Sequence, residues 1–154
     1  MKSQQTPLYR ECLNSNARMV NFAGWDMPIQ FSSVLKEHHA VRESVGVFDI
    51  SHMGVVELKG INAKDNLQRL VPTDLHRIGK GEACYTVLLN NSGKILDDLI
   101  IYDLGQNNDS TESLLLVINA GCSSKDINWL RQNLQKGQIS ITDEKQNNVL
   151  IALQ

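Results

Sequence analysis

The sequence predicts an α+β fold built on a mixed, mainly antiparallel sheet with flanking helices. Seven apolar runs of strand length alternate with three segments of helical periodicity along the 154 residues. Several neighbouring strands are joined by connections too short for a crossover helix, so they are expected to pair as antiparallel hairpins. Residues 55–142 therefore read β-α-β-β-β-α-β, a compact unit with its helices on one side of a sheet.

The first expected helix begins after Ser33, a residue type favoured at N-caps. Four residues recur on one helical face at the spacing i, i+4, i+7 and i+11: Val34, His38, Val41 and Val45. Gly46 suits the left-handed C′ position that ends many helices. Two further helices are expected, one over residues 62–70 with Asn62 as its N-cap, and one over residues 123–137.

Strand-like runs account for most of the remaining apolar residues. They lie at residues 17–22, 55–59, 83–90, 95–103, 114–119, 138–142 and 148–153. The turn-rich stretch 105–111 joins two of these runs and is expected to be a hairpin loop rather than a domain linker.

The hairpin that contains Tyr85 has a register set by the length of its loop at residues 91–94. A two- or four-residue loop places Tyr85 opposite Ile100, with Asp98 and Tyr102 as its diagonal neighbours. A three-residue loop would turn Tyr85 to the other face of the sheet. Under the even-loop register one face carries a carboxylate between two phenols, which would suit a small flat polar ligand.

Asp97 and Asp98 interrupt the apolar run GKILDDLIIYDLG at residues 93–105. Adjacent strand residues point to opposite faces, so the two carboxylates cannot act on one bond as an acid–base pair. Asp98 shares its face with Tyr102. A strand aspartate also commonly accepts backbone N–H bonds or marks a sheet edge. The residues alone therefore leave both a ligand site and a structural role open for Asp98.

The composition indicates a folded chain of one domain, or of one domain plus part of another. It is 42% hydrophobic and 21% charged with a net charge of −2, so neither disorder nor binding to nucleic acid or an anionic membrane is expected. Cys12, Cys84 and Cys122 lack the close pairing of a zinc or redox motif and are expected to be free thiols. No presequence is seen, and no apolar run approaches the roughly 20 residues of a membrane span. We therefore expect a cytoplasmic protein.

A metal site is not expected either. His38 and His39 are adjacent in a predicted helix, so their side chains splay apart and cannot both bind one ion. No cysteine or carboxylate stands nearby at the spacing that metal ligands require.

Five stretches of the chain together match the pattern of a known family. They are TPLY at 6–9, RMVNFAGWDMP at 18–28, EHHAVR at 37–42, GVFDISHMG at 46–54 and GKILDDLI at 93–100. In order and spacing they resemble the start of the T protein of the glycine cleavage system, the tetrahydrofolate-dependent aminomethyltransferase family. Several long motifs in register are far more specific than one short pattern.

The resemblance implies three domains around a central folate pocket, of which this chain would hold an N-terminal part only. Residues 1–54 would be the first part of a split folate-binding domain, and residues 55–137 the α+β domain with the Asp-Asp strand. Residues 138–154 would begin the returning segment of the split domain. Family members are longer, so the chain is expected to be truncated before the C-terminal barrel.

The resemblance also implies an activity. In this family the lipoyl-bearing H protein delivers an aminomethyl group, and the enzyme passes the one-carbon unit to tetrahydrofolate with release of ammonia. Asp98 matches the family's key carboxylate, whereas Asp97, on the opposite face, is expected to be structural. The family's pterin-pocket positions fall on Met53, Tyr85 and Tyr102, with Asn119 and His52 as further candidates. Tetrahydrofolate would be a co-substrate, and no metal is implied.

Two other functions remain open at this point. One is a folate-binding relative without transferase activity, of the iron–sulfur cluster maintenance type. Its Lys-Gly-Cys-Tyr segment is only partly echoed by Gly81-Glu-Ala-Cys-Tyr85 here. The other is an inactive truncated remnant, or a half that works only beside a complementary chain, because the family's C-terminal half supplies further pterin and folate-tail contacts.

Overall fold

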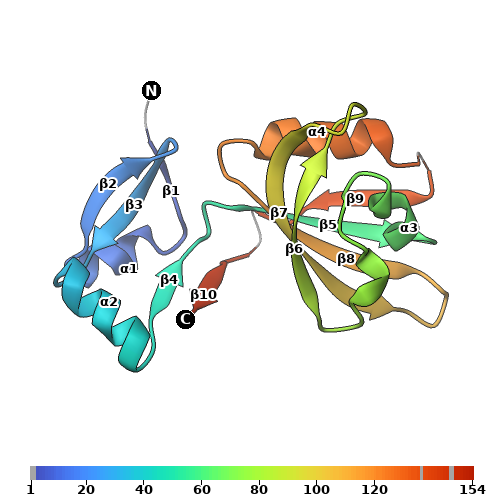
Figure 1. Cartoon of the computed structure of the whole chain (residues 1–154). Coiled ribbons are helices and arrows are strands. Elements are labelled where there is room, and N and C mark those ends of the chain that lie inside the picture. The colour runs from blue at the N-terminus through green and yellow to red at the C-terminus, as the bar shows by residue number, and fades with distance from the viewer. Residues whose placement is uncertain (1–2, 136, 146–147) are drawn as a thin grey trace. The chain divides into compact units, whose positions relative to one another are not determined.

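The computed structural model describes residues 3–135, 137–145 and 148–154 and divides them into two compact units (Figure 1). The first unit comprises residues up to 52 together with 148–154, and the second comprises residues 53–145. Within the described ranges, no helix is long and apolar enough to cross a membrane.

The first unit contains two small sheets and two helices. Strand β3 (Trp25–Gln30) is the central strand of the first sheet, between β1 (Gln4–Gln5) and β2 (Arg18–Phe22). β1 is parallel to β3, whereas β2 is antiparallel to it. The second sheet pairs β4 (Val47–Asp49) with β10 (Ile151–Leu153). The helices are α1 (Tyr9–Asn14) and α2 (Val34–Glu43).

Helix α2 confirms the first predicted helix but is capped by a different side chain. Ser33 occupies the N-cap position without a side-chain cap bond. The Glu37 carboxylate instead accepts hydrogen bonds from the backbone N–H groups of Phe31, Ser32 and Ser33 at 2.9, 2.7 and 3.1 Å. These hydrogen bonds, that from Ser32 foremost, lower the pKa of Glu37. The carboxylate therefore satisfies donors that the helix itself leaves free.

The prediction that Gly46 adopts the left-handed C′ conformation is wrong, because Gly46 has no positive φ. The position requires glycine for a different reason. A Cβ atom on Gly46 would lie 2.5 Å from Cγ2 of Val41, so close packing against α2 excludes a side chain here.

The second unit is a five-stranded antiparallel sheet with helices. In chain order its elements are β5 (Gly54–Gly60), α3 (Ala63–Gln68), η1 (Leu75–Arg77), β6 (Ala83–Leu89), β7 (Ile95–Gln106), β8 (Glu112–Ile118), α4 (Ser123–Asn133) and β9 (Ile139–Asp143). The strands are arranged β6-β7-β8-β5-β9. This order of elements confirms the predicted β-α-β-β-β-α-β unit and the α+β fold class.

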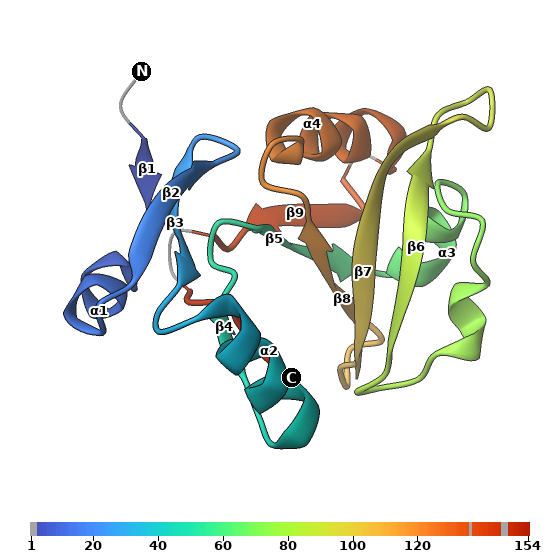
Figure 2. The ribbon, with the colours of Figure 1, turned by 60° about the vertical axis from the view of Figure 1, so that its left-hand side comes forward.

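Strand alternation places the core on one face of this sheet. Alternate residues of β5, β7 and β8 are fully buried, as Leu58, Ile101 and Leu116 illustrate. Apolar residues of α3, η1 and α4 belong to the same cluster, so these helices cover that face (Figure 2). The opposite face bears the intervening residues, including Asp98 and Tyr102.

The β6–β7 hairpin has the even-loop register. Tyr85 pairs with Ile100 and Val87 with Asp98, and the register shifts only next to the turn, at Leu88–Leu89. The turn is closed by Asn90, whose side-chain oxygen accepts from the backbone N–H groups of Ser92 and Lys94 at 2.9 Å each. Tyr85 and Asp98 therefore share the face away from the helices.

Several elements differ from the predicted ones. β1, β3, β4, α1 and η1 were not predicted, and β7 continues to Gln106. The third helix ends at Asn133 instead of residue 137, with residue 136 outside the described residues. The last strand covers only Ile151–Leu153 of the predicted 148–153. β9 pairs with β5, so residues 139–143 lie in the five-stranded sheet.

Candidate functional site

Asp98 lies on the open face of the second unit's sheet, and each of its carboxylate oxygens accepts one hydrogen bond. The Tyr85 hydroxyl donates to Oδ2 at 3.0 Å, and the Asn119 amide Nδ2 donates to Oδ1 at 3.1 Å. The two donors come from neighbouring strands on either side of β7: Tyr85 from β6, and Asn119 from the residue that follows β8. The carboxylate is therefore held in one orientation while half-exposed.

Met53 continues this row across the sheet. Gly54 pairs with Ile118, and Ile118 also pairs with Leu99. One residue further toward the same end of the sheet stand Met53, Asn119 and Asp98, on the chain segments of β5, β8 and β7. Met53 is half-buried. The fold thus brings a thioether, an amide and a carboxylate to one end of the open face.

The two tyrosines stand at different distances from Asp98. Tyr85 is 67% exposed, and its hydrogen bond to Asp98 raises the pKa of its phenol. Tyr102 is 37% exposed and lies four residues along β7, about 13 Å away at the usual rise of a strand. Ile100 separates it from Asp98 on the same face. Ile100, which pairs with Tyr85, therefore contributes an apolar side chain to the face between Asp98 and Tyr102.

His52 belongs to the first unit. Its imidazole ring makes an edge-on contact with the Phe22 ring, with 5.7 Å between the ring centroids. The first unit also contains a cavity of about 250 Å³, lined by residues of β3, α2 and β4 that include Ile29, Val41 and Phe48.

Asp97 points to the opposite face and supports the segment from behind. Its Oδ1 accepts from the backbone N–H of Asp98 at 3.0 Å and from Asn119 Nδ2 at 2.9 Å. Burial alone raises the pKa of Asp97, but hydrogen bonds from Asp126, Asn119, the Asp98 backbone and Cys122 outweigh it. The pKa of Asp97 therefore lies below its ordinary value.

Asp126, in the first turn of α4, is the buried polar residue that the sequence reasoning missed. It is only 1% exposed. Burial, followed by its hydrogen bond to Asp97 and the charge of that residue, raises the pKa of Asp126 to about 7. A signal was present in the sequence, because Asp126 stands one turn before Leu130 on the apolar face of the predicted helix.

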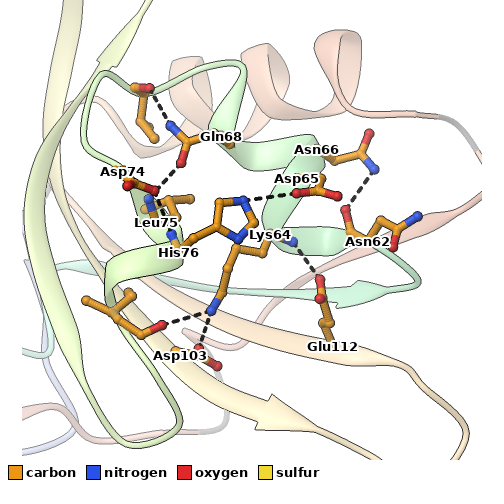
Figure 3. Close-up of polar contacts among 12 residues, drawn as sticks. Asn62, Lys64, Asp65, Asn66, Gln68, Asp74, Leu75, His76, Asp103 and Glu112 are labelled. Carbon is orange, nitrogen blue, oxygen red and sulfur yellow. Dashed lines mark hydrogen bonds and ion pairs between the residues drawn. The ribbon is translucent and has the colours of Figure 1, made fainter.

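A second polar cluster occupies the other end of β7 (Figure 3). Lys64 Nζ donates to Asp103 Oδ2 at 2.5 Å and to the carbonyl oxygen of Ile78 at 2.9 Å. Asp103 Oδ1 accepts from the backbone N–H of Gly105 at 2.7 Å. The Glu112 carboxylate accepts from the backbone N–H of Lys64 at 2.8 Å. Lys64 and Asp103 are matched in charge, which is typical of a structural ion pair.

Metal ligands do not gather in either cluster. Among residues 3–135, 137–145 and 148–154, no group of three or more His, Cys, Asp or Glu side chains could hold an ion. The chemical capacity of the Asp98 site is therefore that of an oriented carboxylate beside aromatic and thioether surface. Such a site can accept a hydrogen bond or a proton from a ring N–H group while the ring rests on the apolar strip.

Comparison with known proteins points to one family. Residues 8–154 match the GCVT N-terminal domain. An aminomethyltransferase of Prochlorococcus marinus (strain MIT 9313) is 63% identical over 154 residues, which covers 100% of this chain and 41% of that protein. An aminomethyltransferase of Synechococcus sp. (strain CC9902) is 59% identical over 150 residues, covering 97% of this chain and 41% of that protein.

A solved structure gives the same indication. The glycine cleavage system aminomethyltransferase T from Bartonella henselae superposes with a TM-score of 0.86 at 34% sequence identity. The match covers 98% of this chain and 40% of that one. The chain thus spans about two fifths of the length of the curated relatives that it matches.

Proposed function

The chain belongs to the GCVT N-terminal domain family, and on that premise we propose that it carries the folate-facing carboxylate of an aminomethyltransferase. The membership confirms the family to which the sequence motifs pointed. The observation that carries the proposal is the double fixation of Asp98, by Tyr85 through Oδ2 and by Asn119 through Oδ1. An outward-facing carboxylate held in this way is suited to orienting a ligand N–H group.

The proposed reaction transfers one carbon between sulfur and nitrogen. The carbon–sulfur bond of an aminomethyl-lipoyl carrier breaks, and the carbon forms bonds to N5 and N10 of tetrahydrofolate. The amino group leaves as ammonia. The two N–H protons of the folate are taken up by the ammonia and by the released thiol, so no oxidant or reductant is required.

Asp98 would act on the folate ring system. Its carboxylate accepts a hydrogen bond from a ring N–H group, which aligns that nitrogen with the incoming carbon. Alignment of two bound reactants can supply most of the rate acceleration, and proton transfer to the carboxylate adds roughly 10²–10⁴-fold. Met53, Tyr85 and Tyr102 would offer the polarisable surface for the pterin ring, with Asn119 holding the carboxylate. His52 stays a prediction from the family resemblance.

The partners and the location follow from the same proposal. The lipoyl-bearing H protein of the glycine cleavage system would deliver the aminomethyl group, and tetrahydrofolate would accept the carbon, without a metal ion, nucleic acid or membrane. The relatives are cyanobacterial, and we place the protein in the cytoplasm. The second unit would be the α+β domain of the enzyme and the first unit part of its split folate-binding domain.

The decisive experiment is a calorimetric titration of the chain with tetrahydrofolate. The proposal predicts measurable binding that weakens at least tenfold in Asp98→Asn, since a charge-assisted hydrogen bond is lost. Asp109→Asn, in the exposed loop after β7, is the matched control and should bind as the wild type does. Tetrahydrofolate binding unchanged by Asp98→Asn would exclude the role proposed for Asp98. No binding by the wild-type chain would favour the alternative that the chain is an inactive truncated remnant.

Transfer is tested separately with an aminomethylated lipoyl carrier protein. Release of ammonia that depends on both the carrier and tetrahydrofolate would identify the transferase activity. Folate binding without any such release would favour the non-transferring, folate-binding relative.

A further inference from the structure

Two carboxyl groups behind Asp98 have no part in the proposed reaction. Asp97 points from β7 toward the face covered by the helices, and Asp126 points from the first turn of α4 toward it. Asp126 is 1% exposed. Asp97 and Asp126 lie close enough for each carboxyl group to act on the pKa of the other. Burying two adjacent acids is costly, and an aliphatic residue at either position would fill the space more cheaply.

A hydrogen bond between two carboxyl groups requires a proton on one of them. Asp97 Oδ1 is occupied by N–H donors from Asp98 and Asn119. In the described part of the chain, Asp97 Oδ2 and both oxygens of Asp126 are buried and have no hydrogen bond of ordinary geometry. A proton shared between Asp97 Oδ2 and the Asp126 carboxyl group would satisfy these oxygens.

The other charged and titratable groups around the pair are few. Lys125 Nζ lies 3.5 Å from Asp126 Oδ1, but it is half-exposed and donates to the carbonyl oxygen of Leu96 at 2.7 Å. The Cys122 thiol, just before α4, hydrogen-bonds Asp97. On the far side of the sheet stands Asp98. Among the described residues, Lys125 is the cation that faces the pair, so two full negative charges there would not be balanced.

The pair is connected to the Asp98 side chain through the Asn119 amide, and to the Asp98 backbone through its N–H group. Asn119 Nδ2 lies 2.9 Å from Asp97 Oδ1, 3.1 Å from Asp98 Oδ1 and 3.2 Å from the Asp98 carbonyl oxygen. An amide group has two hydrogens to share among these three acceptors. Asp97 therefore determines where the Asn119 amide lies, and Asn119 in turn determines where Asp98 Oδ1 lies.

We infer that Asp97 and Asp126 share one proton and act together as positioning residues for Asp98, with Asn119 as the connection. While the proton is present, the pair carries one negative charge and Asp97 remains fixed. Loss of the proton puts two adjacent carboxylates behind the site, and their repulsion displaces Asp97 and the amide that it holds. The geometry thus makes the orientation of Asp98 depend on a buried proton. The consequence for catalysis rests on the proposed function, whereas the proton and the connection do not.

The pKa directions support this arrangement. Burial and the neighbouring Asp97 raise the pKa of Asp126 to about 7, while the pKa of Asp97 is lowered by its hydrogen bonds against the effect of burial. The pKa values of the two carboxyl groups are therefore driven apart, as expected where one of a pair holds the proton and the other the charge.

The direct test is a pH titration of the aspartate carboxyl carbons by ¹³C NMR, without any ligand. The wild type should show Asp126 protonated at pH 5.5, with a step near pH 7 that also appears in the signal of Asp98. Asp126→Asn keeps a donor toward Asp97 and should abolish that step, while Asp109→Asn should preserve it. Two carboxylates fully ionised at pH 5.5, or an Asp98 signal without the step, would overturn the inference even if no variant folds.

The second test measures tetrahydrofolate affinity at pH 6 and pH 8. Wild-type affinity should fall about tenfold more than that of Asp126→Asn over this range, because only the wild type can lose the proton. Asp126→Leu, which has no donor, should bind about tenfold more weakly than Asp126→Asn at pH 6. Equal pH profiles for the wild type and Asp126→Asn would contradict the inference. A wild type that binds at neither pH contradicts the proposed function instead, and the NMR titration then decides the inference alone.

Discussion

The two ends of strand β7 use aspartate in opposite ways. At one end Asp103 is buried against Lys64, and its second oxygen is occupied by a backbone N–H group (Figure 3). At the other end the buried Asp126 lies beside the half-buried Asp97, and Asp98 faces outward. The Lys64–Asp103 pair is balanced in charge, whereas Asp97 and Asp126 are two acids that face the cation Lys125.

The difference shows how charge balance separates a structural cluster from a candidate site. A matched ion pair stabilises the fold only while both partners are present, so its residues are expected to affect folding. An excess of acidic side chains is unfavourable for folding, and its presence in the sequence therefore suggests that these side chains have a function other than stabilising the fold. Four predictions follow from this contrast.

The largest effect is expected at the balanced end. Lys64→Met leaves the buried Asp103 carboxylate without its cation and should lower the unfolding free energy by about 3–5 kcal/mol. Urea denaturation measures it, and Lys94→Met, at an exposed lysine in the β6–β7 turn, should change stability by less than about 0.5 kcal/mol. The double variant Lys64→Met with Asp103→Leu should recover most of the loss. A cost below about 1 kcal/mol for Lys64→Met would contradict the assignment of this end as structural.

The acidic end should make stability depend on pH. The pKa of Asp126 is about 7 in the folded chain and 3.8 when unperturbed, so the folded state binds more protons between these values. The unfolding free energy should therefore fall as pH rises from about 5 to 7, by up to about 1.4 kcal/mol per pH unit. Denaturation at pH 5, 6, 7 and 8 measures the slope.

Asp126→Asn is the matched comparison for that slope. An amide does not titrate, so the variant should lose the decline between pH 5 and 7 and become relatively more stable than the wild type at pH 8. Parallel curves for the two proteins would show that Asp126 titrates normally. The lowered pKa of Asp97 acts in the other direction, because its contribution is lost only when pH falls below about 4.

A smaller change in stability is expected from Asp98. Asp98→Asn removes a half-exposed carboxylate from an acidic surrounding and should change the unfolding free energy by about 1 kcal/mol or less. The same substitution at Asp103 should cost several times more, because there a buried lysine loses its partner. Thermal denaturation of the two variants side by side makes the comparison. Equal losses would mean that Asp98 is as structural as Asp103.

The smallest effect concerns Tyr85 and is spectroscopic. Its hydrogen bond to Asp98 raises the pKa of the phenol, so the phenolate should form at higher pH than that of an unperturbed tyrosine. In Asp98→Asn the pKa of Tyr85 should return toward its ordinary value. Ultraviolet absorbance during alkaline titration follows the change, and Tyr85→Phe identifies which of the three tyrosines is responsible. An unchanged titration curve would mean that the hydrogen bond does not persist in solution.

The sequence predicted the open face of the second unit well. Periodicity located the strands, which is a local property of the chain. Loop length left two registers of the β6–β7 hairpin open. Next to the turn Leu89 pairs with Ile95, and the shift at Leu88–Leu89 then gives the register that places Tyr85 opposite Ile100.

Features that depend on distant contacts could not be predicted in this way. β3 was not predicted because it contains Pro28, and a residue without an N–H group argues against a strand. In the structure Pro28 pairs with Met19 beside a bulge. The proton on Asp126 depends on a strand that lies far away in sequence. Tertiary packing determined each of these outcomes.

The strand order β6-β7-β8-β5-β9 also sets a sequence of assembly during synthesis. β6, β7 and β8 form a meander whose partners leave the ribosome one after another, and such local pairings close quickly. β5 is synthesised before these strands but has no partner until β8 is made, because Gly54 pairs with Ile118 and Gly60 with Glu112. Asp98, Tyr85 and Asn119 can therefore meet while β5 is still unpaired. Met53, at the start of that waiting strand, joins the row only when the nascent sheet closes.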